Sequence, residues 1–124
     1  MTNEQINNKK YDLEERTAQF AEEIIKFCRK IPVNSITLPI ITQLVKAGTS
    51  IGANYGEADD AESGKDFKHK IGICKKESRE TKYWLRIITV AVPQLKEGAD
   101  IFWKEAKELN LIFNAINNKL RKKS

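Results

Sequence analysis

Apolar side chains recur at alternating steps of four and three residues along four separate stretches of this 124-residue chain. The stretches run from Leu13 to Ile31, from Ile41 to Ala58, from Phe67 to Val92 and from Phe102 to Leu120. This spacing places the apolar side chains in one stripe along a helix, and such a stripe has to be buried against other helices. Four stripes joined by short connections can be buried together. The sequence therefore predicts an all-α protein, an antiparallel up-down-up-down four-helix bundle with long, slender helices.

Capping residues and prolines divide the chain into helices at about residues 12–31, 38–62, 64–92 and 100–121. The candidate N-caps, whose side chains accept hydrogen bonds from the first free backbone N–H groups, are Asp12, Thr37, Ser63 and Asp100. The segment 94–99 is expected to be a loop, because Pro93 ends the third helix. Residues 1–11 are polar and aperiodic, and we expect them to form a flexible arm. The whole chain, 1–124, has the length of a single domain.

Nothing in the chain has the residue pattern of an active site. The one histidine, His69, belongs to a single Asp66-x-x-His69 element, whereas di-iron bundles need that element twice with two further glutamates. Cys28 and Cys74 fall at apolar helical positions, where free cysteine behaves as a small hydrophobe. Glycine-rich phosphate loops and nucleophile elbows are missing. We therefore expect a protein that is not an enzyme and has no catalytic residue, metal site or cofactor.

The charge and hydropathy of the chain limit its location and its partners. No apolar run approaches the roughly 20 residues needed to span a membrane, and the N-terminal segment lacks the apolar core of a secretory signal. A cytoplasmic location without a membrane partner is the expectation. The net charge of +5 permits nucleic-acid binding without requiring it, so the positions of the basic residues decide more than their sum.

Three glycines, Gly48, Gly52 and Gly56, follow one another at steps of four in the second helix. Glycine within a helix costs about 0.8–1 kcal/mol relative to alanine, so the spacing calls for a physical reason. A ridge without side chains lets another helix backbone approach closely, and we predict close helix packing at all three positions. The alternative is a second helix that breaks near Gly48, because glycine also ends helices.

Six basic residues share one side of the third helix. When the apolar stripe of this helix takes heptad positions a and d, they fall at the neighbouring positions b and e, interrupted only by Gly72. They are Lys65, Lys68, Lys75, Arg79, Lys82 and Arg86, called the basic stripe below. Like charges at this spacing repel one another, and the phosphates of RNA or DNA would neutralise them. We predict nucleic-acid binding here. The alternative is a basic face that is only solvated, as most charge runs are.

Apolar side chains also lie outside the stripe of the third helix, on its other side. They are Ile73, Tyr83, Trp84 and Ile87, called the apolar flank below, and Trp103 on the last helix is expected to add to it. Tryptophan and tyrosine are favoured at protein interfaces, so we predict that the apolar flank forms the interface of a homo-oligomer. The alternative is a wider core that buries these residues within one chain.

Several segments of the chain resemble one protein family. They are YDLEERTAQFAEEIIKF, GTSIGANYGEA, KDFKHKIGICKKE and RETKYWLRII, within roughly residues 11–90. These segments resemble bacterial four-helix-bundle proteins of the ribosomal intervening-sequence type, first noticed as reading frames inside insertions of 23S rRNA genes. The residues that match the family motif are Ser50, Ile51, Ala53, Asn54, Glu57, Phe67 and Glu80. Gly56 departs from it, since many relatives place a larger residue there.

The resemblance implies a bundle that assembles as a ring. The family is similar to the accessory variability determinant of diversity-generating retroelements, a basic pentameric barrel that binds nucleic acid and its reverse transcriptase. For this chain it implies a homopentamer without catalytic residues. Two functions stand open. One is a non-enzymatic oligomer that binds RNA or DNA through the basic stripe. The other is an oligomeric scaffold or adaptor for another protein, such as a reverse transcriptase, without direct nucleic-acid binding.

Overall fold

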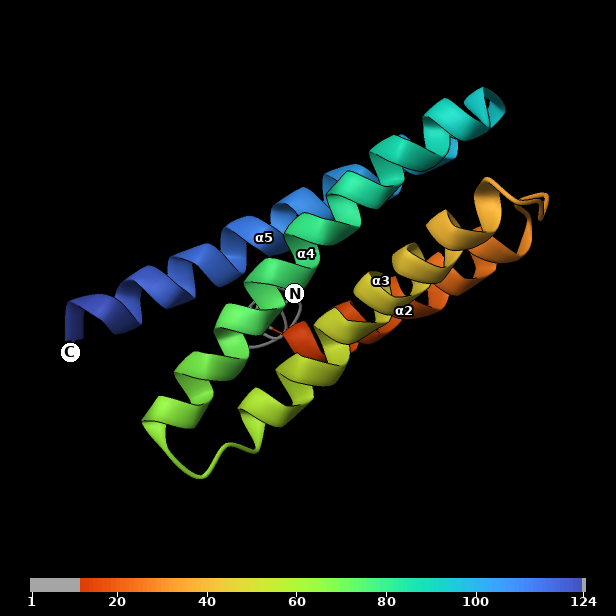
Figure 1. Cartoon of the computed structure of the whole chain (residues 1–124). Helices are drawn as coiled ribbons and strands as arrows, with labels where there is room; N and C mark the ends of the chain where they lie inside the picture. Colours follow the sequence, from red (N-terminus) through yellow and green to blue (C-terminus); the bar gives the residue numbers. More distant parts are fainter. Residues whose placement is uncertain (1–11, 124) are drawn as a thin grey trace, which may run out of the picture.

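The computed structural model describes residues 12–123, so the predicted flexible arm at 1–11 lies outside the described residues. Four long helices make up nearly all of the described chain (Figure 1). They are α2 (Leu13–Arg29), α3 (Thr37–Asp59), α4 (Gly64–Ala91) and α5 (Lys96–Lys123), with the short 3-10 helix η1 (Pro93–Leu95) before α5. Within residues 12–123, no helix is both long and apolar enough to cross a membrane.

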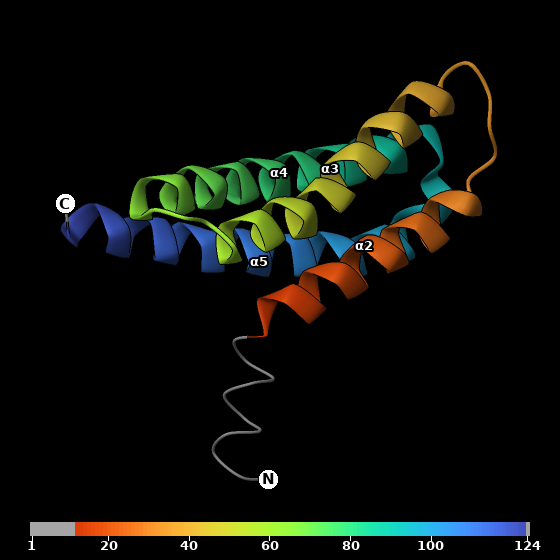
Figure 2. The same ribbon diagram turned by 90° about the horizontal axis from the view of Figure 1, so that it is seen from below.

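Each helix runs antiparallel to the one before it, which confirms the predicted all-α four-helix bundle. α4 packs along α3 on one side and along α5 on the other, while α2 packs mainly on α3. Figure 2 shows the two layers that result, and in both views the last turns of α5 run beyond the start of α2. α4 is therefore the central helix of the packing, and it also carries the predicted site.

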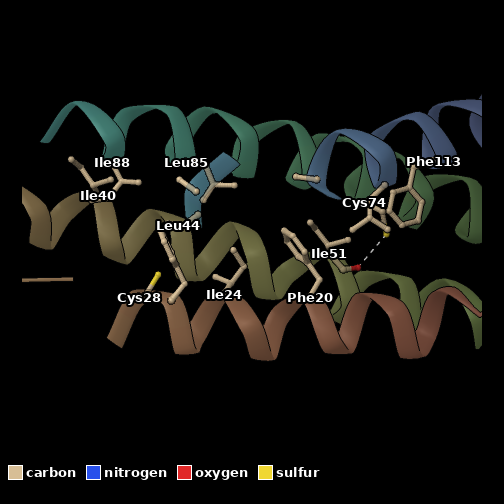
Figure 3. Close-up of a cluster of buried hydrophobic side chains, with 14 of the residues drawn as sticks. Phe20, Ile24, Cys28, Ile40, Leu44, Ile51, Cys74, Leu85, Ile88 and Phe113 are labelled. Carbon is tan, nitrogen blue, oxygen red and sulfur yellow. Dashed lines mark hydrogen bonds between the residues drawn. The ribbon is translucent and has the colours of Figure 1, made fainter. Parts of the chain in front are cut away.

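The predicted apolar stripes form one continuous core. Figure 3 shows Leu44 beside Leu85, where the stripes of α3 and α4 meet, and Ile40 beside Ile88. Ile40 is buried at the start of α3, whereas Ile41, with which the predicted stripe began, is only partly buried. Phe113 of α5 is fully buried in the same cluster. The stripe residues with polar side chains are satisfied locally, because each hydroxyl donates a hydrogen bond to a carbonyl of the preceding turn. The bonds are Thr17 to Leu13 (2.6 Å), Ser78 to Lys75 (2.9 Å) and Thr81 to Glu77 (2.7 Å).

Both cysteines are free thiols buried in this core. The thiol of Cys74 donates to the carbonyl oxygen of Ile51 across α3 and α4, with sulfur and oxygen 3.5 Å apart (Figure 3). Burial raises the pKa of Cys28 to about 11 and that of Cys74 to about 12. The thiolate is the reactive form of cysteine, so both residues are structural.

Two of the four predicted caps are confirmed, and two, Thr37 and Asp100, are wrong. Asp12 and Ser63 accept hydrogen bonds from the N–H groups three residues later, as N-caps of α2 and α4. Thr37 does not cap α3. Instead the Oδ1 of Asn34 accepts from the N–H groups of Ile36 and Thr37, each at 2.9 Å, and the Thr37 hydroxyl donates to the carbonyl of Pro32. The asparagine satisfies the free N–H groups, so the chain turns into α3 before the residue that was expected to cap it.

The last helix begins earlier than predicted. We expected a loop at 94–99 and a cap at Asp100, but Pro93 opens η1 and α5 starts at Lys96. Proline fits the first turn of a helix, where its missing N–H needs no partner, so Pro93 ends α4 and starts the next turn. Gly98 then lies within α5, where a Cβ atom would stand 3.4 Å from the Phe27 ring. Ala99, also in the expected loop, is fully buried.

The three glycines of α3 do not share one role. A Cβ atom at Gly48 would lie 3.0 Å from Cγ2 of Ile24, and one at Gly52 would lie 3.1 Å from Oγ1 of Thr17. Both positions let α2 approach α3 closely. At Gly56 nothing lies within 4 Å, so the prediction of close packing there is wrong. α3 continues unbroken through all three positions.

Candidate nucleic-acid interface

The basic stripe runs along most of α4. This helix has 28 residues, which makes it about 42 Å long. The side chains at heptad position b (Lys65, Arg79, Arg86) are exposed, and those at position e (Lys68, Lys75, Lys82) are half-buried. The difference follows from the packing, because position e lies next to the core stripe and position b one step further out.

α5 borders the basic stripe and adds to it. Nζ of Lys82 lies 5.6 Å from the ring centroid of Trp103 on α5, and Nζ of Lys107 lies at the same distance from the same ring. The side-chain amide of Asn110 donates to the carbonyl of Lys75, at 2.8 Å. One aromatic ring thus holds a lysine from each helix by cation–π attraction. We did not predict Lys107 as part of the site.

The heptad pattern of α5 carries the signal that would have identified Lys107. When Ala106 and Leu109 are placed at a and d, Trp103 and Asn110 fall at e and Lys107 at b. The basic stripe occupies the same heptad positions on α4. These three α5 residues therefore meet the basic stripe where α4 and α5 pack. The prediction that Trp103 adds to the apolar flank is wrong for the same reason, because Trp103 lies on the side of the basic stripe.

A shallow hollow of about 360 Å³ lies at the C-terminal end of the basic stripe. Arg86 of α4 and Lys96 of α5 line it together with Trp103, and Asp100 is the acidic residue in it. The basic surface therefore spans both helices at this end.

The acidic residues of α4 lie outside heptad positions b and e, which the basic stripe occupies. Glu77 and Glu80 fall at positions g and c, on the side that faces α3. Burial raises the pKa of Glu77, and the charge of Glu80 raises it further. Lys70, which lies outside the stripe, pairs with Glu57 of α3 at 3.1 Å. Within residues 12–123, no residue of the basic stripe forms an ion pair with an acidic side chain.

The apolar flank is only partly exposed to solvent. Trp84 and Ile87 are half-buried and pack against the core, and Ile73 is half-buried as well. Tyr83 is the exception, with 55% of its surface exposed. Its ring meets that of Trp84 edge to face, with the centroids 4.9 Å apart. Beside this pair lies a hollow of about 540 Å³, lined by Gln43, Arg79, Glu80, Tyr83 and Trp84.

The described residues offer no arrangement for metal chemistry. Across residues 12–123, no three histidine, cysteine, aspartate or glutamate side chains come together in a way that could hold a metal ion. His69 is exposed, at position f of α4. The arrangement supports binding of an extended anion along α4 and α5.

Known proteins share the sequence pattern and the fold of this chain. The family model described as 23S rRNA-intervening sequence protein matches residues 9–115. Among solved structures, the chain is similar to a protein with unknown function from the S23 ribosomal protein family of Bacteroides thetaiotaomicron, with a TM-score of 0.76 and 30% sequence identity. The similarity covers 85% of this chain and 94% of that chain. Among curated proteins, none matches this chain.

Proposed function

Since the chain belongs to the 23S rRNA-intervening sequence protein family, as the resemblance predicted, we propose that it is a non-enzymatic protein that binds RNA or DNA. The basic stripe is the proposed contact surface. One observation carries the proposal. Heptad positions b and e of α4 carry the six basic side chains and no acidic residue, and α5 extends this surface with Lys107.

The electrostatics of the stripe favour a polyanion as its partner. Like charges one turn apart on a helix destabilise it by a few tenths of a kcal/mol per pair, so the bare stripe is under repulsion. Phosphates remove that repulsion, and the counterions they release strengthen binding most at low salt. The cation–π contacts of Trp103 hold Lys82 and Lys107 in place, which lowers the entropy they lose when a phosphate binds.

The test compares two double variants in their affinity for an unrelated duplex and an unrelated single strand. Lys75→Ala with Arg79→Ala removes two charges from the basic stripe. Arg29→Ala with Lys30→Ala removes two charges at the end of α2 and serves as the matched control. We expect the stripe variant to reduce the slope of log affinity against log salt by about 1.4–1.8, and the control to leave it unchanged. Equal slopes for the two variants would refute the proposed site.

We propose further that the protein self-associates, as a homopentamer, in the cytoplasm. Exposed apolar side chains support self-association. Val33, Ile36 and Leu38 are 52–68% exposed where the chain enters α3. The apolar flank supplies the other candidates for the interface. Sedimentation that gives a monomer at tens of micromolar would refute self-association.

The same exposed apolar residues favour a second candidate function, that of an oligomeric scaffold or adaptor for another protein, such as a reverse transcriptase. In that case the basic stripe is only solvated, and wild-type protein has no measurable affinity for nucleic acid at low salt. The salt titration separates the two functions, because it measures nucleic-acid binding directly.

A further inference from the structure

We infer that the hollow beside Tyr83 and Trp84 holds an unpaired nucleobase, so that the preferred ligand is a single strand. This inference rests on the proposed function, because the basic stripe supplies the affinity for phosphate. It adds the class of nucleic acid and a second contact, made to the base. Four observations about this part of α4 carry it.

The first observation is the aromatic pair itself. Trp84 packs against the core, which fixes its position, and Tyr83 meets it edge to face with an angle of 79° between the rings. In such a pair one ring can cover at most one face of the other, so at least one face of the Tyr83 ring is not covered by Trp84. A ring fixed in this way at the surface is a platform on which a base can stack.

The second observation concerns the other aromatic ring at the stripe. Trp103 already has two ammonium groups over its ring, those of Lys82 and Lys107, each 5.6 Å from the centroid. It therefore holds the lysines and is not free to stack on a base. The Tyr83–Trp84 pair has no such contact with a lysine or arginine among the described residues, so it is the available platform.

The third observation is the polar lining of the hollow. Gln43 of α3 offers an amide that donates and accepts, and Glu80 offers a carboxylate that accepts. These are the groups that pair with the Watson–Crick edge of a base. The negative charge of Glu80 repels phosphate, so the hollow suits the base and not the backbone. In a duplex this edge is already paired and the base is stacked. An unpaired base with an exocyclic amino group fits the lining.

The fourth observation is the position of the arginines. Arg79 precedes Tyr83 by four residues and Arg86 follows it by three, so each lies one helical turn away on nearly the same face. Arg79 also lines the hollow. A base stacked at Tyr83 would therefore have a cation on either side for the phosphates that flank it. The hollow of about 540 Å³ lies within the size range of small-ligand sites.

The test replaces Tyr83 and uses Val90 as its matched control. Val90 occupies the same heptad position one repeat later on α4 and is 76% exposed. Fluorescence anisotropy would measure the affinity of Tyr83→Ala, Tyr83→Phe and Val90→Ala for three labelled probes of one length. The probes are a single-stranded oligoadenylate, the same strand with its bases removed, and a hairpin duplex.

We expect Tyr83→Ala to weaken binding of oligoadenylate by about 5- to 150-fold, the usual loss when one stacked base is released. Tyr83→Phe keeps the ring, so its affinity should match that of the wild type. Binding of the duplex and the abasic strand, and the salt slope, should not change. Val90→Ala should change none of these affinities.

Three outcomes would overturn the inference. They are an unchanged affinity of Tyr83→Ala for oligoadenylate, an equal loss for all three probes, and dissociation of an assembly by Tyr83→Ala in sedimentation, which would assign Tyr83 to self-association. Failure of the proposed function looks different, because then the stripe variant with Lys75→Ala and Arg79→Ala leaves the salt slope unchanged. A wild-type protein that binds none of the probes would refute both.

Discussion

Replacing Gly52 by alanine tests the close approach of α2 and α3. The new Cβ atom would lie 3.1 Å from Oγ1 of Thr17 and 3.3 Å from the backbone carbonyl carbon of the same residue. A flexible side chain could move aside, but the backbone of α2 can yield only if the whole helix shifts. Forcing an extra carbon into such a contact costs about 1–3 kcal/mol. Alanine is about 1 kcal/mol more favourable than glycine within a helix, which offsets part of this cost. Gly52→Ala should therefore be neutral to about 2 kcal/mol less stable than the wild type.

Gly56→Ala is the matched control, since it makes the same change one turn later on α3, where nothing lies within 4 Å. It should stabilise the protein by up to about 1 kcal/mol through helix propensity alone. The difference between the two alanine variants removes the propensity contribution and leaves the cost of the contact, about 1–3 kcal/mol. Urea unfolding followed by circular dichroism at one protein concentration measures it. Equal stabilities, or a more stable Gly52→Ala, would refute the close approach.

Three further predictions concern other parts of the bundle. Arg16 of α2 forms two hydrogen bonds of 2.8 Å to Glu105 of α5, so Arg16→Ala should lower the free energy of unfolding by roughly 1 kcal/mol in urea titrations. Cys28 and Cys74 should resist iodoacetamide at pH 8 until urea unfolds the chain, as mass spectrometry can measure. Burial raises their pKa values above the ordinary value of 9.0 for a thiol, so they contribute stability that is fully present below pH 9 and is lost as the pH rises through about 11 to 12. Gly72 interrupts the basic stripe, and a Cβ atom added there would meet no other atom within 4 Å. Gly72→Lys should therefore strengthen nucleic-acid binding and steepen the salt slope by about 0.7–0.9.

Each of these predictions has a result that would contradict it. An unchanged stability of Arg16→Ala would mean that the ion pair does not contribute to holding α2 on α5. Rapid modification of either cysteine in the folded protein would mean that the core is open at that position. An unchanged salt slope for Gly72→Lys would mean that the bound nucleic acid does not run along the stripe.

The bundle could be predicted because burial imposes its period on the sequence. The stripes through Ile24, Leu44, Leu85 and Phe113 occupy the core positions that the four-three spacing assigns to them. The start of α5 could not be predicted in the same way. Pro93 ends a helix and equally fits the first turn of the next one, and only the packing of Ala99 decides between these.

The candidate site was predictable to the extent that it lies on a single helix. The positions of Arg79 and Arg86 on the exposed side of α4 follow from its heptad pattern alone. The pairing of Lys82 with Trp103 does not, because it depends on which helix packs beside α4. Gly56 shows the same limit, since its spacing from Gly52 says nothing about where α2 and α3 diverge.

The salt dependence of nucleic-acid affinity tests the central claim most directly. Anisotropy titrations of the wild-type protein with a single-stranded oligonucleotide at several salt concentrations give the slope of log affinity against log salt. If three to six residues of the basic stripe contact phosphates, the slope lies between about −2 and −4. A slope near zero, or the absence of binding at the lowest salt concentration, would contradict the claim that the basic stripe binds nucleic acid.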